Sequence, residues 1–229
     1  MCLLVTKRAL LIVSLLVFGL LSTTALGTQL IVHLQHGFDL VSFFSYFTYL
    51  SNIFAALVLL VGAGYLLTHR EPTMRDDILR GSAVASMAIV GIVFSVFLRD
   101  ANLGSLVPWV NIVLHYVMPV VMVAYWLILP PKTSLSLRQI VWWLIYPALY
   151  LVYTLIRGRI VGLYPYPFLN PNKVAQYGDP GGYGGVARFP VAIPGGYGGV
   201  ALFCVALLVA STVASGLLIV VGNRLTRRV

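Results

Sequence analysis

The dominant pattern along the chain is a series of long apolar runs separated by short polar segments. A helix needs about 20 mainly apolar residues to cross a bilayer. The runs are continuous rather than alternating segments of about 10 residues, which excludes a transmembrane β-barrel. We therefore expect an all-α polytopic membrane bundle, residues 1–229 forming a single membrane domain. Six runs qualify as spans: approximately 9–32, 44–67, 79–98, 107–129, 138–157 and 199–222.

The first run has a second interpretation as a secretory signal peptide. It begins after Lys7 and Arg8, and Ala25-Leu26-Gly27 resembles a small-residue cleavage site. Its apolar stretch continues to Val32, whereas the core of a signal peptide has roughly 7–15 residues. The length favours a retained membrane-spanning helix.

Composition supports the bilayer as the solvent of this chain. Hydrophobic residues make up 60% of the sequence and charged residues only 9%, with a mean hydropathy of +0.95. Soluble domains carry roughly 25% charged residues. The formal net charge of +9 comes from cations that stand at the ends of apolar runs, not from a basic patch interleaved with aromatic residues. Membrane lipids, and not nucleic acid, are therefore the expected partners.

The distribution of basic residues predicts the orientation in the membrane, because cytoplasmic loops carry an excess of Lys and Arg. The other side of a six-span chain has five basic residues, most of them near one long loop at about 158–198. We predict that both termini are cytoplasmic. Ten basic residues share the side of the termini: Lys7, Arg8, Arg70, Arg75, Arg80, Lys132, Arg138, Arg224, Arg227 and Arg228.

The long loop contains a tandem repeat. The segment 180–187, Pro-Gly-Gly-Tyr-Gly-Gly-Val-Ala, recurs at 194–201 with a period of 14 residues. We interpret it as a short duplication in a flexible loop. Cys2 and Cys204 are spaced like neither a metal site nor a disulfide framework. We accordingly predict no metal site and no cofactor.

Polar side chains at membrane depth are costly, so they are candidates for function. His115 is the only histidine well inside a predicted span, and Asn111 lies on the same helix face four residues earlier. Thr48 and Asn52 form a similar pair in the second span. Both spans start at the outer face, which places Thr48 and His115 roughly 6 and 12 Å below it. A hydroxyl beside a histidine base is the minimum apparatus for nucleophilic catalysis.

A competing interpretation is that these side chains only join helices, since Ser, Thr and His often hydrogen-bond between spans. No acidic residue lies within the predicted spans to orient His115. A haem-b carrier would need axial ligands on facing helices, and only His115 is deeply placed. His33 and His36 near the outer end of the first span are expected to be solvated loop residues. A transporter or lipid-binding protein with a polar, outward-facing pocket remains the alternative function.

Three segments together resemble motifs of one known family. They occur in order and on the same predicted side of the membrane. The family comprises the androgen-induced-gene multi-pass membrane proteins and their predicted six-pass bacterial relatives. The segments are Phe47-Thr48-Tyr49-Leu50, then Trp109-Val110-Asn111-Ile112-Val113-Leu114-His115 followed by Pro119, and Tyr166-Pro167-Phe168-Leu169. The sequence departs from the family in having Ile112 where the family has an additional histidine.

The resemblance implies a threonine hydrolase that cleaves fatty acid esters of hydroxy fatty acids. Thr48 would be the nucleophile and His115 the general base. Helix geometry makes Asn52 and Asn111 candidates for orienting the base or stabilising an oxyanion. The bacterial relatives imply a location in the bacterial cytoplasmic (inner) membrane.

Two residues near the end of the fifth span are candidates for substrate binding. Arg157 could hold a fatty-acid carboxylate, or it could anchor the helix to lipid headgroups. Tyr153, one turn earlier, could line the pocket or belong to the interfacial aromatic belt.

Overall fold

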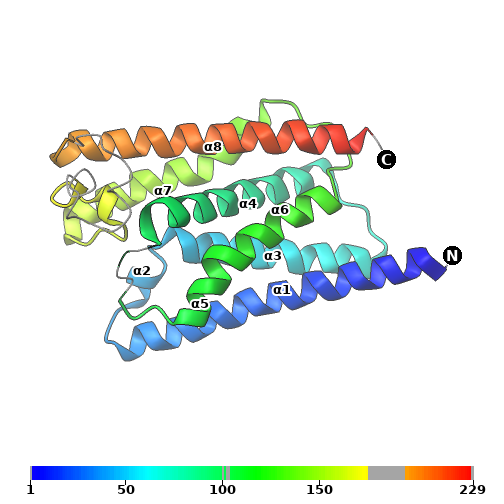
Figure 1. The fold of residues 1–229 in the computed structure, drawn as a ribbon, viewed down its shortest axis with the longest axis horizontal. Helices are drawn as coiled ribbons and strands as arrows, with labels where there is room; N and C mark the ends of the chain where they lie inside the picture. The colour runs from blue at the N-terminus through cyan, green and yellow to red at the C-terminus, as the bar shows by residue number, and fades with distance from the viewer. Residues whose placement is uncertain (1, 100, 102–103, 175–193, 228–229) are drawn as a thin grey trace.

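The computed structural model describes residues 2–99, 101, 104–174 and 194–227, and none of these residues forms a β-strand. Six helical segments are long and apolar enough to cross a membrane. This confirms the prediction of an all-α polytopic bundle. The two ends of the chain lie at the same end of the bundle, which we call the terminal end (Figure 1). The segments span Thr6–Gln35, Phe47–Thr68, Met74–Leu98, Pro108–Ile128, Gln139–Val161 and Gly196–Thr226.

The helices are α1 (Cys2–Gln35), α3 (Phe47–Thr68), α4 (Met74–Val93), α7 (Gln139–Val161) and α8 (Gly196–Thr226). Between α1 and α3 lies a single turn, α2 (Leu40–Phe43). The fourth span is interrupted. It consists of α5 (Pro108–Ile112), a π-helical turn η2 (Val113–Val117) and α6 (Met118–Ile128). A second π-helical turn, η1 (Phe94–Leu98), ends the third span, and a short 3₁₀ turn, η3 (Pro167–Leu169), follows α7.

The loop between α7 and α8 is shorter than the sequence predicted. Helix α7 continues to Val161 and α8 begins at Gly196, so the connection is 162–195 rather than 158–198. The second copy of the repeat is therefore largely the first turns of α8, and our interpretation of it as flexible loop is wrong. Gly199 packs so closely on the carbonyl of Pro194 that a Cβ there would overlap it. The first copy, 180–187, lies outside the described residues.

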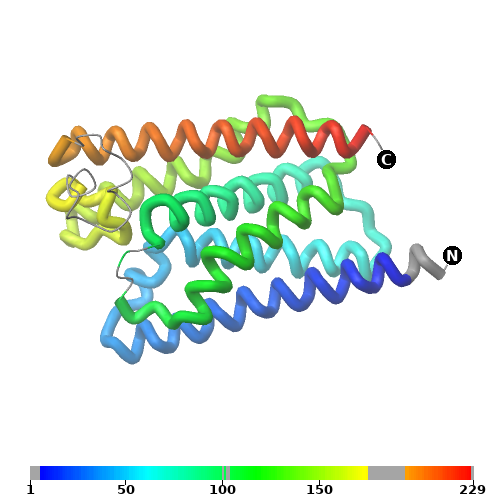
Figure 2. Tube along the Cα trace, viewed as in Figure 1, coloured from blue at the N-terminus to red at the C-terminus, as the bar shows by residue number. Residues whose placement is uncertain are grey.

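Helix α4 occupies the centre of the bundle and contacts α3, α6, α7 and α8. In the span that contains α4, 61% of the apolar stretch is buried. In α8, which lies at the edge of the bundle (Figure 1), the buried share of the apolar stretch is 22%. Small residues allow these contacts, and Gly81 of α4 lies directly against the Trp143 ring of α7. Residues 162–174, which follow α7, lie at the end opposite the termini, where Figure 2 shows them beside the start of α8. We call this end the loop end.

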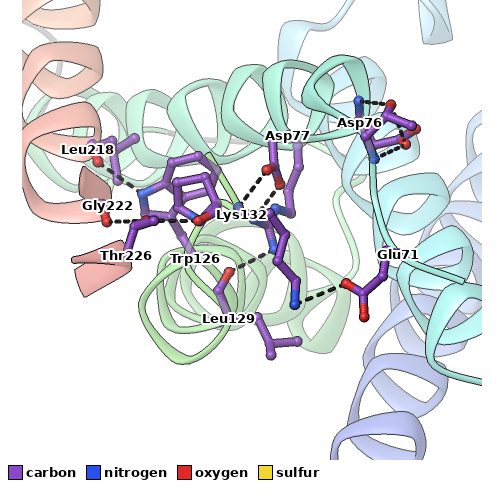
Figure 3. Close-up of polar contacts among 12 residues, drawn as sticks. Glu71, Asp76, Asp77, Trp126, Leu129, Lys132, Leu218, Gly222 and Thr226 are labelled. Carbon is purple, nitrogen blue, oxygen red and sulfur yellow. Dashed lines mark hydrogen bonds and ion pairs between the residues drawn. The ribbon is translucent and has the colours of Figure 1, made fainter. Parts of the chain in front are cut away.

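The first turn of α4 carries acidic residues that the predicted span, which began at residue 79, left out. A capping box begins the helix, because Thr73 and Asp76 bond each other's backbone N–H groups. Asp77 is 1% exposed and pairs with Arg80 one turn later at 2.7 Å. Its other oxygen accepts the backbone N–H of Lys132, which joins α4 to the loop after α6 (Figure 3). The third helix thus starts earlier than the predicted span and includes two acidic residues that the span did not contain.

Candidate functional site: a cavity lined by Thr48, His115 and Tyr166

Thr48 and His115 line the same cavity, near the loop end of the bundle. Both side chains are buried, with 6% of each residue exposed. The cavity has a volume of about 50 Å³, which is room for one or two water molecules. The remaining walls come from α4, η1, α7, η3 and α8 and are almost wholly apolar. They include Val90, Phe94, Leu98, Tyr150, Phe168, Leu208 and the hydroxyl-bearing Ser211.

The two π-helical turns meet at this cavity. Phe94, the first residue of η1, stacks on the imidazole of His115 in η2, with ring centroids 4.0 Å apart and an interplanar angle of 23°. Single π-helical turns within α-helices occur frequently at functional sites. Here the stacking fixes the plane of the histidine ring against the wall of α4.

Pro119 and Asn52 explain how the π-helical turn at His115 is stabilised. The Met118 N–H bonds to the Val113 carbonyl, and Pro119 has no N–H, so neither can donate to the carbonyl of Leu114. A buried carbonyl without a partner is costly. The Asn52 side chain of α3 supplies the missing donor, since its Nδ2 bonds the Leu114 carbonyl at 3.2 Å and the Thr48 carbonyl at 2.9 Å. Asn52 therefore joins the helix of Thr48 to the residue beside His115.

His115 is oriented by a backbone group. Its Nδ1 lies 3.2 Å from the carbonyl oxygen of Asn111. Because a carbonyl can only accept, this contact requires the proton on Nδ1 and leaves Nε2 of the neutral imidazole as the acceptor. A general base needs such a free acceptor. The role suggested for the Asn111 amide is thus filled by the Asn111 backbone.

Tyr166 is the member of the site to which the sequence assigned no role. Its hydroxyl oxygen lies 3.2 Å from both the backbone nitrogen and Oγ1 of Thr48. The phenol accepts the Thr48 N–H, which belongs to the first turn of α3 and has no partner within the helix. Burial raises the pKa of Tyr166 to about 12, even though the hydrogen bonds with Thr48 lower it. The phenol therefore stays protonated at neutral pH.

Thr48 and His115 share the cavity without a direct hydrogen bond between their side chains. Among the described residues, the only side-chain partner of the Thr48 hydroxyl is Tyr166. Two buried amide oxygens near the site, Oδ1 of Asn52 and Oδ1 of Asn111, have no hydrogen-bond partner. Neither asparagine lines the cavity itself, so these oxygens lie behind its wall.

Tyr153 and Arg157 do not line this cavity. They lie one turn apart on α7, beside the turn α2. Tyr153 is 41% exposed and its hydroxyl is 2.9 Å from that of Ser45. Arg157 donates from Nη2 to the Ser42 hydroxyl at 3.4 Å, while its Nη1 is buried and has no partner. The structure thus separates these two residues from the Thr48–His115 pair.

Of the two histidines that were expected to be solvated, His33 is buried and His36 is exposed. His33 is 7% exposed, and its Nε2 lies 3.1 Å from the carbonyl oxygen of Asp39, so the interpretation as a solvated residue is wrong for it. The turn after α1 folds back over the ring, which also packs against Phe38 and Phe43. His36 is exposed, as expected. No group of three or more His, Cys, Asp or Glu residues that could hold a metal ion occurs within the described part of the chain.

Comparison of the chain with protein-family models, with curated proteins and with solved structures found no match, so a function has to be argued from the residues themselves.

Proposed function

We propose that this membrane protein is a lipid-ester hydrolase with Thr48 as the nucleophile and His115 as the general base. The observation that carries the proposal is that both side chains line one buried cavity, with Nε2 of His115 left as an acceptor. The three motifs shared with the androgen-induced-gene family support the same pair of residues.

The reaction would proceed in two steps. Thr48 Oγ1 attacks the ester carbonyl while Nε2 of His115 takes its proton, and the tetrahedral intermediate then releases the alcohol, which receives that proton. This leaves an acyl group on Thr48. A water molecule, deprotonated by His115, attacks the acyl carbonyl and releases the carboxylic acid, which regenerates the threonine hydroxyl.

Tyr166 and the start of α3 are suited to stabilise the charge that develops in this reaction. When the Tyr166 phenol donates a hydrogen bond to Thr48 Oγ1, the threonine hydroxyl does not donate to Tyr166. The threonine proton is then free to pass to His115. Once Oγ1 has attacked the ester carbonyl, the same phenol can donate to the oxyanion of the tetrahedral intermediate, which a buried hydrogen-bond donor stabilises far better than water does. The positive end of the α3 macrodipole adds to this effect, because Thr48 lies in its first turn.

The lining of the cavity favours an acyl substrate. Its walls carry aliphatic and aromatic side chains from six elements, and Thr48, His115, Tyr166, Tyr150 and Ser211 are its polar members. The cavity holds a reacting carbonyl but not the chains attached to it. Leu207, Leu208 and Ser211 of α8 form one wall, and α8 is the least buried of the six spans. A small outward displacement of α8 would admit the chains from the bilayer.

Purified protein in nanodiscs, assayed with branched and linear fatty-acid esters, tests the proposal. Thr48→Val should abolish turnover, and His115→Gln should reduce kcat by roughly 10²–10⁴-fold, the usual contribution of a general base. Thr48→Ser should retain activity, because it keeps the hydroxyl. Two matched controls, Thr212→Ala and His36→Ala, remove exposed residues of the same types that do not line the cavity.

Activity retained in either Thr48→Val or His115→Gln would overturn the proposed roles. Circular dichroism and gel filtration separate loss of chemistry from loss of fold. If the folded wild type hydrolyses none of the esters, the alternative function as a non-enzymatic transporter or lipid-binding protein replaces the hydrolase.

A further inference from the structure

A second and larger cavity lies at the terminal end of the bundle, away from Thr48 and His115. Its volume is about 750 Å³, and none of its residues lines the first cavity. It is formed by α1, α3, the loop after α3, α4, α6 with the loop that follows, and the last residue of α8, Thr226. Because α4 runs between the two cavities, they occupy opposite ends of the same helix.

The walls of this cavity divide into an apolar part and a charged part. Leu57 and Val61 of α3, Leu79 of α4 and Ile128 of α6 line it with aliphatic side chains. These four residues are 52–61% exposed, so in a membrane they border the hydrocarbon. The charged part lies beyond them, toward the chain termini. It consists of four cationic side chains, Arg8, Arg70, Arg80 and Lys132, and three carboxylates, Glu71, Asp76 and Asp77.

Two of the carboxylates are held in place by the fold, so a ligand would not displace them. Asp77 is paired with Arg80 and bonded to the Lys132 backbone. The Arg80 guanidinium also donates to the Leu129 carbonyl at 2.7 Å and lies over the Tyr125 and Trp126 rings. Asp76 caps α4 and accepts a hydrogen bond from Tyr65 at 2.9 Å. These contacts form the fixed floor of the cavity.

Arg8, Arg70 and Lys132 are the cations that remain available. Arg8 donates to the carbonyl of Leu66 and to Nδ1 of His69, and no carboxylate within the described residues pairs with it. Arg70 lies over the Tyr65 ring and its charge acts on the nearby Asp76 carboxylate, but it makes no direct ion pair with a carboxylate of the described residues. Lys132 pairs with Glu71 at 3.0 Å, but both side chains are well exposed, at 59% and 76% (Figure 3). An exposed ion pair of this kind adds little stability, so another anion can readily replace Glu71 beside Lys132.

We propose that this cavity binds a phospholipid with an anionic headgroup. One acyl chain would lie along Leu57, Val61, Leu79 and Ile128, and the phosphate would contact Arg8, Arg70 and Lys132 in place of Glu71. The excess of one cation over the carboxylates matches the single negative charge of a phosphodiester. A groove that joins a hydrocarbon-facing wall to clustered cations at the membrane surface fits this class of ligand. The proposal does not depend on the ester chemistry at Thr48.

Native mass spectrometry of the full chain in detergent, with equal amounts of phosphatidylglycerol and phosphatidylcholine, tests the site. We expect selective retention of phosphatidylglycerol. Arg70→Gln and Lys132→Gln should each weaken its binding about fivefold, the effect of roughly one surface cation. Glu71→Gln should strengthen binding, because it removes the competing carboxylate. Arg75→Gln is the matched control, since Arg75 is an exposed cation in the first turn of α4 and does not line the cavity.

Misfolding cannot produce the increase in phosphatidylglycerol binding that we expect for Glu71→Gln. This variant therefore distinguishes a change at the site from loss of the fold. Val61→Trp, which fills the apolar part of the groove, should abolish selective retention, whereas Val213→Trp on the exposed face of α8 should not. Equal retention of both lipids, or an equal loss in Arg75→Gln, would overturn the proposal. The proposal would also be overturned if inorganic phosphate stabilised the protein and displaced phosphatidylglycerol to the same extent in wild type and in Val61→Trp. That result would indicate a site for a free ion.

Discussion

At the scale of single residues, Thr48 is held by one phenol. Both its amide and its hydroxyl contact the Tyr166 oxygen at 3.2 Å, while its carbonyl accepts from Asn52. The conformation of the threonine is thus set by a residue 118 positions later in the chain. Because the Tyr166 oxygen makes both contacts, removing that one atom measures what Tyr166 contributes to the site.

We predict that Tyr166→Phe lowers kcat for ester hydrolysis by roughly 10²-fold, because it deletes an oxyanion donor while keeping the ring. Loss of the bond to the Thr48 amide should also lower the free energy of unfolding by about 1 kcal/mol. Steady-state kinetics in nanodiscs and thermal unfolding measure the two effects. Tyr164→Phe is the control, because Tyr164 belongs to the same loop but does not line the cavity. Unchanged kcat in Tyr166→Phe would remove the phenol from the mechanism.

The raised pKa of Tyr166 also predicts a dependence of stability on pH. Its folded pKa of about 12 lies above the ordinary value of 10.0, so the unfolded chain loses this proton first. The corresponding stability is complete below about pH 10 and declines as the pH rises toward 12. Thermal unfolding between pH 9 and 12 should therefore show a smaller loss in Tyr166→Phe than in the wild type. Identical losses would indicate that the phenol ionises normally.

Arg157 carries a prediction about substrate preference. Its buried Nη1 has no partner, which is an unfavourable state for a charged group. If a substrate carboxylate fills this position, Arg157→Met should raise KM about tenfold for esters with a free carboxylate. KM for the corresponding methyl esters should not change. An equal change in KM for both substrate series would assign Arg157 to helix anchoring, the other interpretation of the sequence.

The sequence was sufficient to find Thr48 and His115, because a polar residue in a long apolar run stands out and helical spacing gives its depth. It could not place Tyr166, whose hydroxyl reaches Thr48 only because η3 folds back against the start of α3. Nor could it separate Arg157 from the cavity. Whether that residue reaches the cavity depends on how α7 is rotated against α2, which hydropathy does not specify.

At the scale of the elements, the π-helical interruption of the fourth span positions His115 in the wall of the cavity. We predict that Pro119→Ala, which restores an N–H, allows a regular α-helix and rotates the imidazole away from the cavity. The expected result is at least a tenfold loss of kcat with unchanged or increased thermal stability, since a proline within a helix costs about 3 kcal/mol. Retention of full activity would show that the π-helical turn does not depend on the proline.

The contact between α4 and α7 depends on the absence of a side chain at one position. A Cβ at Gly81 would overlap the Trp143 ring, whereas a Cβ at Gly64 meets nothing within 4 Å. We therefore predict that Gly81→Ala lowers the free energy of unfolding by about 1–3 kcal/mol, the usual cost of overpacking. Gly64→Ala should be neutral or slightly stabilising, because alanine favours the helix. Thermal unfolding of the two variants compares them directly, and similar values would contradict the packing argument.

The spans themselves were predictable, because the bilayer requires about 20 apolar residues and pairs every backbone group within a helix. Their ends were not. Helix α4 begins five residues before its predicted span, since Thr73 and Asp76 cap it beyond the apolar run. Helix α8 begins three residues early, within glycines that favour a loop in isolation. The π-helical turn η2 could not be predicted either, because the donor for the Leu114 carbonyl comes from Asn52 on another helix.

At the scale of the whole molecule, the orientation in the membrane is the prediction that remains to be measured. We expect the terminal end to face the cytoplasm, because ten of the fifteen basic residues lie on that side. To measure the orientation, a single cysteine is introduced in place of His36, at the loop end, or of Glu71, at the terminal end. Both variants also carry Cys2→Ser and Cys204→Ser. A membrane-impermeant maleimide added to intact cells should label position 36, and position 71 only after permeabilisation. The reverse pattern would invert the topology.

The hydrogen bond between Asn52 and the Leu114 carbonyl has a consequence for how this protein evolves. Asn52 supplies the donor that Pro119 withholds, so its bond to the Leu114 carbonyl is needed only while the proline is present. A chain that replaced Pro119 would regain a backbone donor and make the buried amide redundant, while a chain that lost Asn52 first would leave a carbonyl unpaired in the membrane. Natural homologues should therefore keep or lose this asparagine and this proline together, although 67 positions separate them in the sequence.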